Sequence, residues 1–220
     1  MKLFFATDVH GSEICWKKFI NAGKFYEAEV LILGGDMTGK AIVPIIAQGN
    51  DKYKVTLLEQ ESILNGKEEA DKMAATIQNR GYYPYLTTPD EVAEISATPG
   101  KSDELFLTQV LKTLERWMDY ADQKLAGTGI RCYVCPGNDD VFEVDAVIAA
   151  SKLVRSAVMR SVWSAPASAS NKLMPAISGI DLIVSRVART KVTPISAISW
   201  KKVDGSTAAS TCSTWYTCAI

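Results

Sequence analysis

Residues 2–11 read KLFFATDVHG, an apolar run that ends in an aspartate and a histidine. Two later segments have the same form, because residues 30–36 read VLILGGD and residues 132–140 read CYVCPGNDD. Their apolar parts do not alternate with polar residues, which is typical of parallel strands that are covered on both faces. Polar residues that follow such strands meet at one edge of an open α/β sheet, where these sheets hold their ligands.

Helical patterns separate the three strands and predict a mixed α/β chain. Ser12 is a candidate N-cap for a helix that continues to about residue 26, so the first strands form a strand–helix–strand unit. The strongest helical pattern covers residues 102–125, with apolar residues at steps of three and four. Residues 144–154 predict a further helix.

The segment between the second and third strands is long enough to hold a subdomain of its own. Residues 40–47 and 52–58 predict a hairpin, and residues 67–80 predict a helix. We therefore predict a core of residues 1–155 with an inserted α/β subdomain at about residues 39–100.

The insertion contains an aromatic run, YYPY at residues 82–85. These tyrosines could line a substrate cleft or could pack the insertion onto the core, and packing is the simpler interpretation.

Composition indicates a globular protein that does not enter a membrane. The chain has 220 residues, 47% of them apolar, and a net charge of −1. No apolar stretch approaches the roughly 20 residues that span a bilayer, and the five cysteines, an odd number, suggest reduced thiols and a cytoplasmic location. Cys132 and Cys135 are interpreted as small apolar residues of a buried strand, since no second pair completes a zinc or redox site.

Charge divides unevenly along the chain. Residues 1–143 contain 15 Lys/Arg and 22 Asp/Glu, a net of −7, and residues 144–220 contain 9 and 3, a net of +6. The later basic residues are scattered, without a cluster or helical stripe, so nucleic acid is not expected as a partner. Glutamate is absent after Glu143. We predict that residues 156–220 are an atypical tail, which a shifted reading frame would explain.

The three strand ends together resemble the calcineurin-like metallophosphoesterase family. Its pattern of D-x-H, G-G-D and G-N-[HD] is matched in order by residues 8–10, 34–36 and 137–139. The resemblance implies a layered β-sandwich flanked by helices, here with a truncated or aberrant C-terminal half. Taken singly, each motif is also ordinary turn chemistry.

The resemblance further implies a dinuclear metal centre that hydrolyses phosphate mono- or diesters. Asp8 and His10 would bind one ion, Asp36 would bridge two ions, and Asn138 would bind the second. The ions would be manganese, iron or zinc, and the substrate a phosphorylated small molecule or nucleotide. Such a protein would be a hydrolase, and specifically a phosphatase.

Two departures from the family pattern affect this function. Asp139 stands where the family commonly has a histidine, and as a candidate catalytic residue it could donate a proton only if its pKa were raised. His10 is the one histidine in the chain, so the later histidine ligands are missing and the second metal site is incomplete. We expect a phosphoesterase with impaired activity. The alternative is a non-catalytic relative that binds metal or phosphate as a regulatory or scaffold module.

Overall fold

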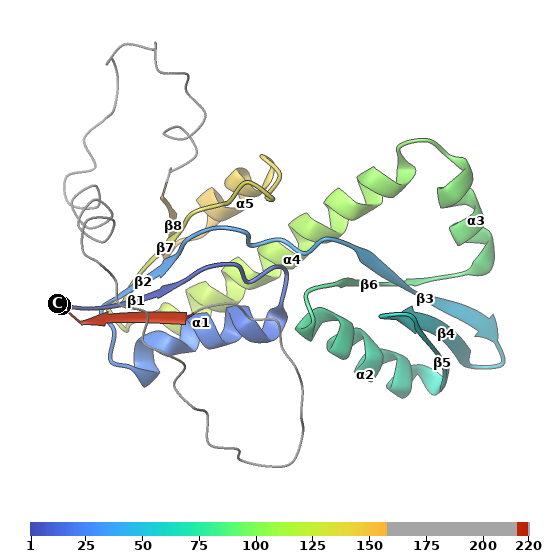
Figure 1. Cartoon of the computed structure of the whole chain (residues 1–220), viewed down its shortest axis with the longest axis horizontal. Coiled ribbons are helices and arrows are strands. Elements are labelled where there is room, and N and C mark those ends of the chain that lie inside the picture. Colours follow the sequence, from blue (N-terminus) through green and yellow to red (C-terminus); the bar gives the residue numbers. More distant parts are fainter. Residues whose placement is uncertain (158–214, 220) are drawn as a thin grey trace, which may run out of the picture. The chain divides into compact units, whose positions relative to one another are not determined.

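The computed structural model describes residues 1–157 and 215–219, so most of the predicted tail lies outside the described residues. Within them the fold is mixed α/β, with two sheets and five helices (Figure 1). The predicted α/β class is confirmed. None of the helices in this part of the chain is long and apolar enough to cross a membrane.

The first sheet carries the three strands that the opening motifs predicted. Its strand order is β8-β7-β2-β1-β9, and β9 is antiparallel to β1 whereas all other neighbours are parallel. The carboxyl ends of β1, β2, β7 and β8 therefore lie at one edge. The strands are β1 (Lys2–Ala6), β2 (Val30–Leu33), β7 (Arg131–Val134), β8 (Val154–Ser156) and β9 (Trp215–Ala219).

Three helices pack against one face of this sheet: α1 (Glu13–Phe25), α4 (Lys101–Leu125) and α5 (Val144–Ala150). Ser12 caps α1 as predicted, since its side chain accepts a hydrogen bond from the Cys15 backbone amide. Helices α1 and α4 meet through two stacked indole rings, Trp16 and Trp117, whose centroids are 5.0 Å apart. Both side chains are fully buried, so this contact helps to hold the two helices together.

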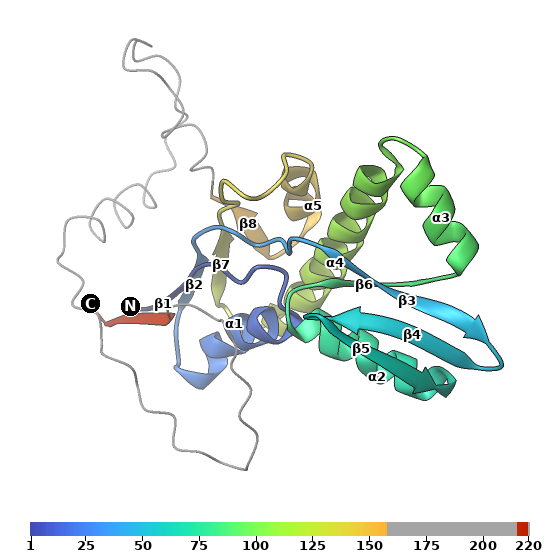
Figure 2. The ribbon, with the colours of Figure 1, turned by 45° about the vertical axis from the view of Figure 1, so that its right-hand side comes forward.

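The second sheet lies within the segment predicted as an insertion, which keeps that name here. Its strand order is β5-β4-β3-β6, with α2 packed on one face (Figures 1 and 2). Its small core joins Val43, Ile45 and Val55 of the sheet to Ala70 and Ile77 of α2. The elements are β3 (Ile42–Gly49), β4 (Lys52–Leu57), β5 (Gln60–Asn65), α2 (Gly66–Asn79), β6 (Tyr83–Thr87) and α3 (Pro89–Ala97).

Backbone contacts join the insertion to the core close to the first motif. A Cβ atom at Gly81 would overlap the carbonyl oxygen of His10, and one at Gly39 would overlap that of Gly81. The Ser12 hydroxyl also donates to the carbonyl oxygen of Asn79 at 2.7 Å. These segments can approach so closely only because glycine has no side chain.

Of the tyrosine run, Tyr83 packs the insertion onto the core, whereas Tyr82 and Tyr85 make contacts within the insertion. Tyr83 is buried, its ring meets Phe106 of α4 edge to face, and its hydroxyl accepts a hydrogen bond from the Gly39 amide at 2.7 Å. Burial raises the pKa of Tyr83 to about 12. Tyr82 packs against the core of the insertion, and the Tyr85 hydroxyl donates to the Glu91 carboxylate.

One predicted helix near the end of the core differs from the structure, and a strand at the end of the chain was not predicted. Helix α5 stops at Ala150 rather than continuing to residue 154, and the chain then forms strand β8. The Asp122 side chain of α4 causes this change, because it accepts hydrogen bonds from the Ser151 hydroxyl and from the Lys152 and Leu153 amides. Strand β9, which pairs with β1, was not predicted from the sequence either.

Candidate metal centre at the carboxyl ends of the core strands

The loops after β1 and β2 run side by side beyond the ends of their strands. Backbone amides of the first loop donate to carbonyl oxygens of the second, from Asp8 to Gly35 at 3.1 Å and from His10 to Asp36 at 2.9 Å. A third bond joins Gly11 to Met37 at 2.7 Å. The parallel pairing of the strands thus continues into the loops and holds the first two motifs together.

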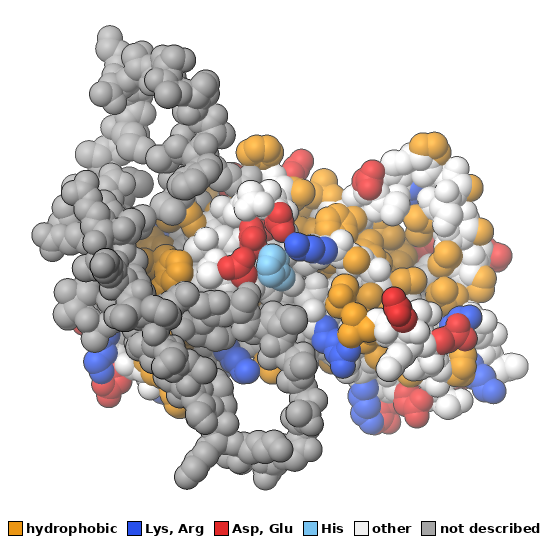
Figure 3. Space-filling model, viewed as in Figure 1, with side chains coloured by type: hydrophobic (Ala, Val, Ile, Leu, Met, Phe, Trp, Pro, Cys, Tyr) orange, Lys and Arg blue, Asp and Glu red, His pale blue; other side chains and the backbone are white. Residues whose placement is uncertain are grey.

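The side chains of Asp8, His10 and Asp36 converge at this edge. Each offers one ligand atom, and these atoms all lie within 4.8 Å of one another. In the described part of the chain this is the one such group of three or more His, Cys, Asp or Glu residues. All three side chains are partly exposed, and Figure 3 shows the histidine among acidic side chains on the surface.

The same three residues have strained backbones. Their φ angles are +57° at Asp8, +43° at His10 and +48° at Asp36, in the left-handed region that L residues rarely adopt. Such a conformation persists only where the surroundings impose it, and it is frequent at functional sites. Here the hydrogen bonds between the loops impose it, so the three side chains are held in place before any ligand binds.

The third motif approaches Asp36 from the other side. The Asp139 backbone amide donates to Asp36 Oδ1 at 3.4 Å, and a Cβ atom at Gly137 would overlap that same oxygen. Asn138 is exposed, and its side-chain amide donates to the Asp139 carboxylate at 3.0 Å. All five residues singled out in the sequence therefore lie at one edge of the sheet.

The surroundings of Asp139 do not favour the proton-donor role expected for it. Its carboxylate pairs with the Lys40 ammonium group at 3.0 Å, and that hydrogen bond lowers the pKa of Asp139. A lowered pKa keeps the carboxylate ionised, so it can accept or orient a group but does not supply a proton near neutral pH.

Asp140 joins the second motif to the third, a role that sequence reasoning missed. Its buried carboxylate accepts hydrogen bonds from the backbone amides of Met37 (3.1 Å), Thr38 (2.8 Å) and Gly137 (2.7 Å), and from the Thr38 hydroxyl (2.8 Å). The only sequence signal was a second acidic residue after Asn138, and it did not reveal which loop the side chain would reach.

The arrangement fits a divalent cation. Two atoms bound to one ion at about 2.0–2.6 Å lie at most about 5 Å apart, so separations within 4.8 Å need no rearrangement of the backbone. His10 Nδ1 is buried without a hydrogen-bond partner among the described residues, and a buried polar atom of this kind normally has one. Burial, with the negative charges of Asp139 and Asp8, raises the pKa of Asp36. A cation bound to Asp36 would offset the negative charges that raise its pKa. The imidazole atom next to the Asp8 carboxylate is His10 Nε2, which lies 3.7 Å from Asp8 Oδ1.

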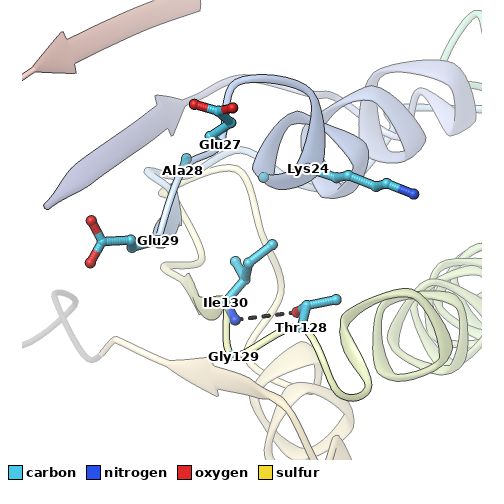
Figure 4. A pocket seen from close by; sticks show the side chains of 8 residues that line it. Lys24, Glu27, Ala28, Glu29, Thr128, Gly129 and Ile130 are labelled. Carbon is cyan, nitrogen blue, oxygen red and sulfur yellow. Dashed lines mark hydrogen bonds between the residues drawn. The ribbon is translucent and has the colours of Figure 1, made fainter.

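Two other candidate sites in the described residues offer fewer groups that could bind a ligand. Cys132 and Cys135 are buried in and just after β7. Burial raises the pKa of the Cys132 thiol, which serves as an apolar residue, and the Cys135 thiol donates to the carbonyl oxygen of Ala157 at 2.7 Å. A cavity of about 440 Å³ lies at the opposite edge of the sheet (Figure 4). Its charged side chains point outward, and Glu27 and Glu29 pair with Lys2 and the N-terminal amine.

Comparisons of the chain with protein-family models, with curated proteins and with solved structures found no significant match. The functional assignment therefore depends on the motifs and on their geometry.

Proposed function

We propose that this protein is a metal-dependent phosphoesterase whose ion is held by Asp8, His10 and Asp36. The observation that carries the proposal is the convergence of their ligand atoms within 4.8 Å, at the carboxyl edge of a mainly parallel sheet. The donor set of two carboxylates and one imidazole suits manganese, iron or zinc. A bound divalent ion would polarise a phosphoryl oxygen and lower the pKa of a bound water.

Some residues of the site would bind the ion, and others would hold the binding loops in position. The loop hydrogen bonds hold Asp8 and His10 with their side chains toward Asp36, and Asp140 holds Met37 and Thr38 immediately after Asp36. A second ion between Asp36 and Asn138 would lack further histidine ligands, because His10 is the one histidine of the chain, so we propose a single occupied site. The layered sandwich and the phosphorylated small-molecule or nucleotide substrate belong to the same proposal.

A non-catalytic metal- or phosphate-binding protein is the second candidate. It is favoured by the single histidine of the chain and by the ion pair that keeps Asp139 ionised. Hydrolysis of a chromogenic aryl phosphate, measured with the purified chain and added Mn²⁺, separates the two candidates. The phosphoesterase hydrolyses the ester only with metal present, whereas the binding protein takes up metal and leaves the ester intact.

Metal binding itself is tested by calorimetry with Mn²⁺ on the wild type and two variants. Asp36→Asn should weaken binding at least about tenfold, since it removes a charged ligand. Asp139→Asn, which leaves all three ligands in place, should have a smaller effect. Equal losses in both variants would argue against the role given to Asp36, and a wild type that binds no Mn²⁺ would exclude the proposed function.

A further inference from the structure

Lys40 is a lysine on the loop after β2 whose backbone is fixed from two directions. Thr38 is held by Asp140 through both its amide and its hydroxyl, at 2.8 Å each. Gly39 donates its amide to the buried Tyr83 hydroxyl at 2.7 Å and lies directly against Gly81. The two residues before Lys40 are therefore anchored to the core and to the insertion, so the side chain starts from a rigid position.

The ammonium group of Lys40 lies beside the candidate metal centre. Its Nζ atom is 3.0 Å from Asp139 Oδ2, and the backbone amide of Asp139 donates to Asp36 Oδ1, one of the three candidate ligands, at 3.4 Å. The lysine side chain is 67% exposed. One of its three N–H donors is directed to Asp139, and the other two remain available to a ligand from solvent.

We propose that Lys40 is the anion-binding group of this site, and that it supplies the second positive charge beside a single metal ion. The inference rests on the proposed metal site. Asp8, His10 and Asp36 provide three ligands for one ion, and the chain contains no other histidine to complete a second. A second divalent ion at Asn138 would be repelled by the ammonium group, because Asn138 and Lys40 both contact the Asp139 carboxylate, at 3.0 Å each.

A metal ion and an ammonium group placed side by side favour the binding of a phosphate group. A phosphate monoester carries about −1.5 to −2 charges near neutral pH, so a divalent ion and an ammonium group on either side of it both attract it. Lysine acts as a point charge toward phosphate oxygens. The Asp139 carboxylate is a positioning group, because its bond to Lys40 directs the ammonium group toward the edge where Asp36 lies.

The competing explanation is an ordinary surface ion pair, and the chain contains a matched example. Lys54 pairs with Glu61 at 2.8 Å in the insertion, and both side chains are partly exposed. Exposed pairs of this kind contribute little to stability. Neither Lys40→Ala nor Lys54→Ala should therefore unfold the protein, which circular dichroism can verify.

The experiment titrates Mn²⁺ into the full chain by calorimetry, and then inorganic phosphate into the Mn²⁺-loaded chain. We expect one Mn²⁺ per wild-type chain. Lys40→Ala should bind Mn²⁺ at least as tightly, because a nearby positive charge is removed, and should bind phosphate about tenfold more weakly or worse. Lys40→Arg, which keeps the charge, should stay within about threefold of the wild type, and Lys54→Ala should equal it.

The outcomes separate this inference from the proposed function. If Lys40→Ala binds phosphate as tightly as the wild type, the anion site is wrong while the metal site stands. Two Mn²⁺ ions per wild-type chain would overturn the single-ion arrangement. A wild type that binds no Mn²⁺ removes the proposed function, and the inference falls with it.

Discussion

The core loops and the hairpin turns of the insertion share an uncommon backbone conformation for different reasons. In the insertion, the non-glycine residues with positive φ angles occur in two consecutive pairs, Asn50–Asp51 and Leu58–Glu59, each joining two antiparallel strands. Two such residues make a turn whose twist matches that of the flanking strands. In the core, Asp8, His10 and Asp36 adopt positive φ where no hairpin requires it. The insertion uses the conformation to connect strands, and the core uses it to bring three ligand side chains together.

This difference implies that the core loops depend on distant partners, whereas the hairpin turns depend on their own strands. The loops around Asp36 are held by Asp140 and Tyr83, each more than 40 residues away in sequence. The turns are held by the ladder bonds on either side of them. Changes to the core partners should therefore destabilise the protein far more than changes to exposed positions.

The largest effect is expected for Asp140→Ala. The substitution leaves the donors of Met37, Thr38 and Gly137 without their buried acceptor, so we expect a loss of about 3–5 kcal/mol in the free energy of unfolding. Urea denaturation measures it. The control is Asp119→Ala, an exposed aspartate on α4 that should change stability by less than about 0.5 kcal/mol. Similar losses in the two variants would show that Asp140 does not hold the loops.

Two glycines with nearly equal φ angles separate the effect of the close backbone contact at Gly81 from the effect of the positive φ angle. Gly81 (φ +87°) lies against the His10 carbonyl group, whereas a Cβ atom at Gly49 (φ +80°), in the β3–β4 hairpin, would meet no atom within 4 Å. Gly49→Ala should lower the free energy of unfolding by about 1–2 kcal/mol, through backbone strain alone. Gly81→Ala should cost about 1–3 kcal/mol more, because the added methyl group displaces the loop. Thermal unfolding of both variants measures the difference. Equal losses in the free energy of unfolding would mean that the backbone at Gly81 and His10 moves apart without an energetic penalty.

Local patterns in the sequence predicted most elements of the fold. The strands that end in the three motifs, the cap at Ser12 and the long helix α4 all follow from periodicity and turn chemistry, and the structure contains them. These signals are local, since a strand or helix that buries one face needs apolar residues at a fixed spacing. The shared edge of the candidate site followed from the same signals, because consecutive parallel strands place their carboxyl ends together.

Sequence reasoning missed one element because its turn lacks the usual residues, and others because they depend on contacts between distant residues. Strand β5 was not predicted because the turn at Leu58–Glu59 contains none of the usual turn residues. Helix α5 stops early because Asp122, far back in α4, binds the backbone amides that follow it. The reach of Asp140 to Thr38 and of Lys40 to Asp139 depends on the same kind of distant pairing. No spacing within a single segment reveals such pairs.

Two glutamates, one in the core and one in the insertion, allow the two regions to be compared in how their stability depends on pH. Glu13 in the core is nearly buried and accepts hydrogen bonds from Trp117 Nε1 at 2.6 Å and Arg116 at 2.9 Å. Burial acts to raise the pKa of Glu13, but the bonds from Trp117, Arg116 and Lys17 outweigh it and the pKa is lowered. Glu91 in the insertion also has a lowered pKa, through Thr87 and Tyr85, but it is partly exposed to solvent.

The smallest predicted effect is the pH dependence that Glu13 gives to stability. Because its folded-state pKa lies below the ordinary value of 4.5, the ionised side chain stabilises the fold above that value, and the stabilisation is lost as pH falls through the folded-state pKa. We expect Glu13→Gln to lower the free energy of unfolding by about 1–2 kcal/mol near pH 7 and by clearly less near about pH 3. Glu91→Gln should change this pH dependence less, since solvent screens its bonds. Urea denaturation at both pH values tests this, and a Glu13→Gln deficit that does not shrink in acid would show that the carboxylate charge is not what stabilises the α1–α4 contact.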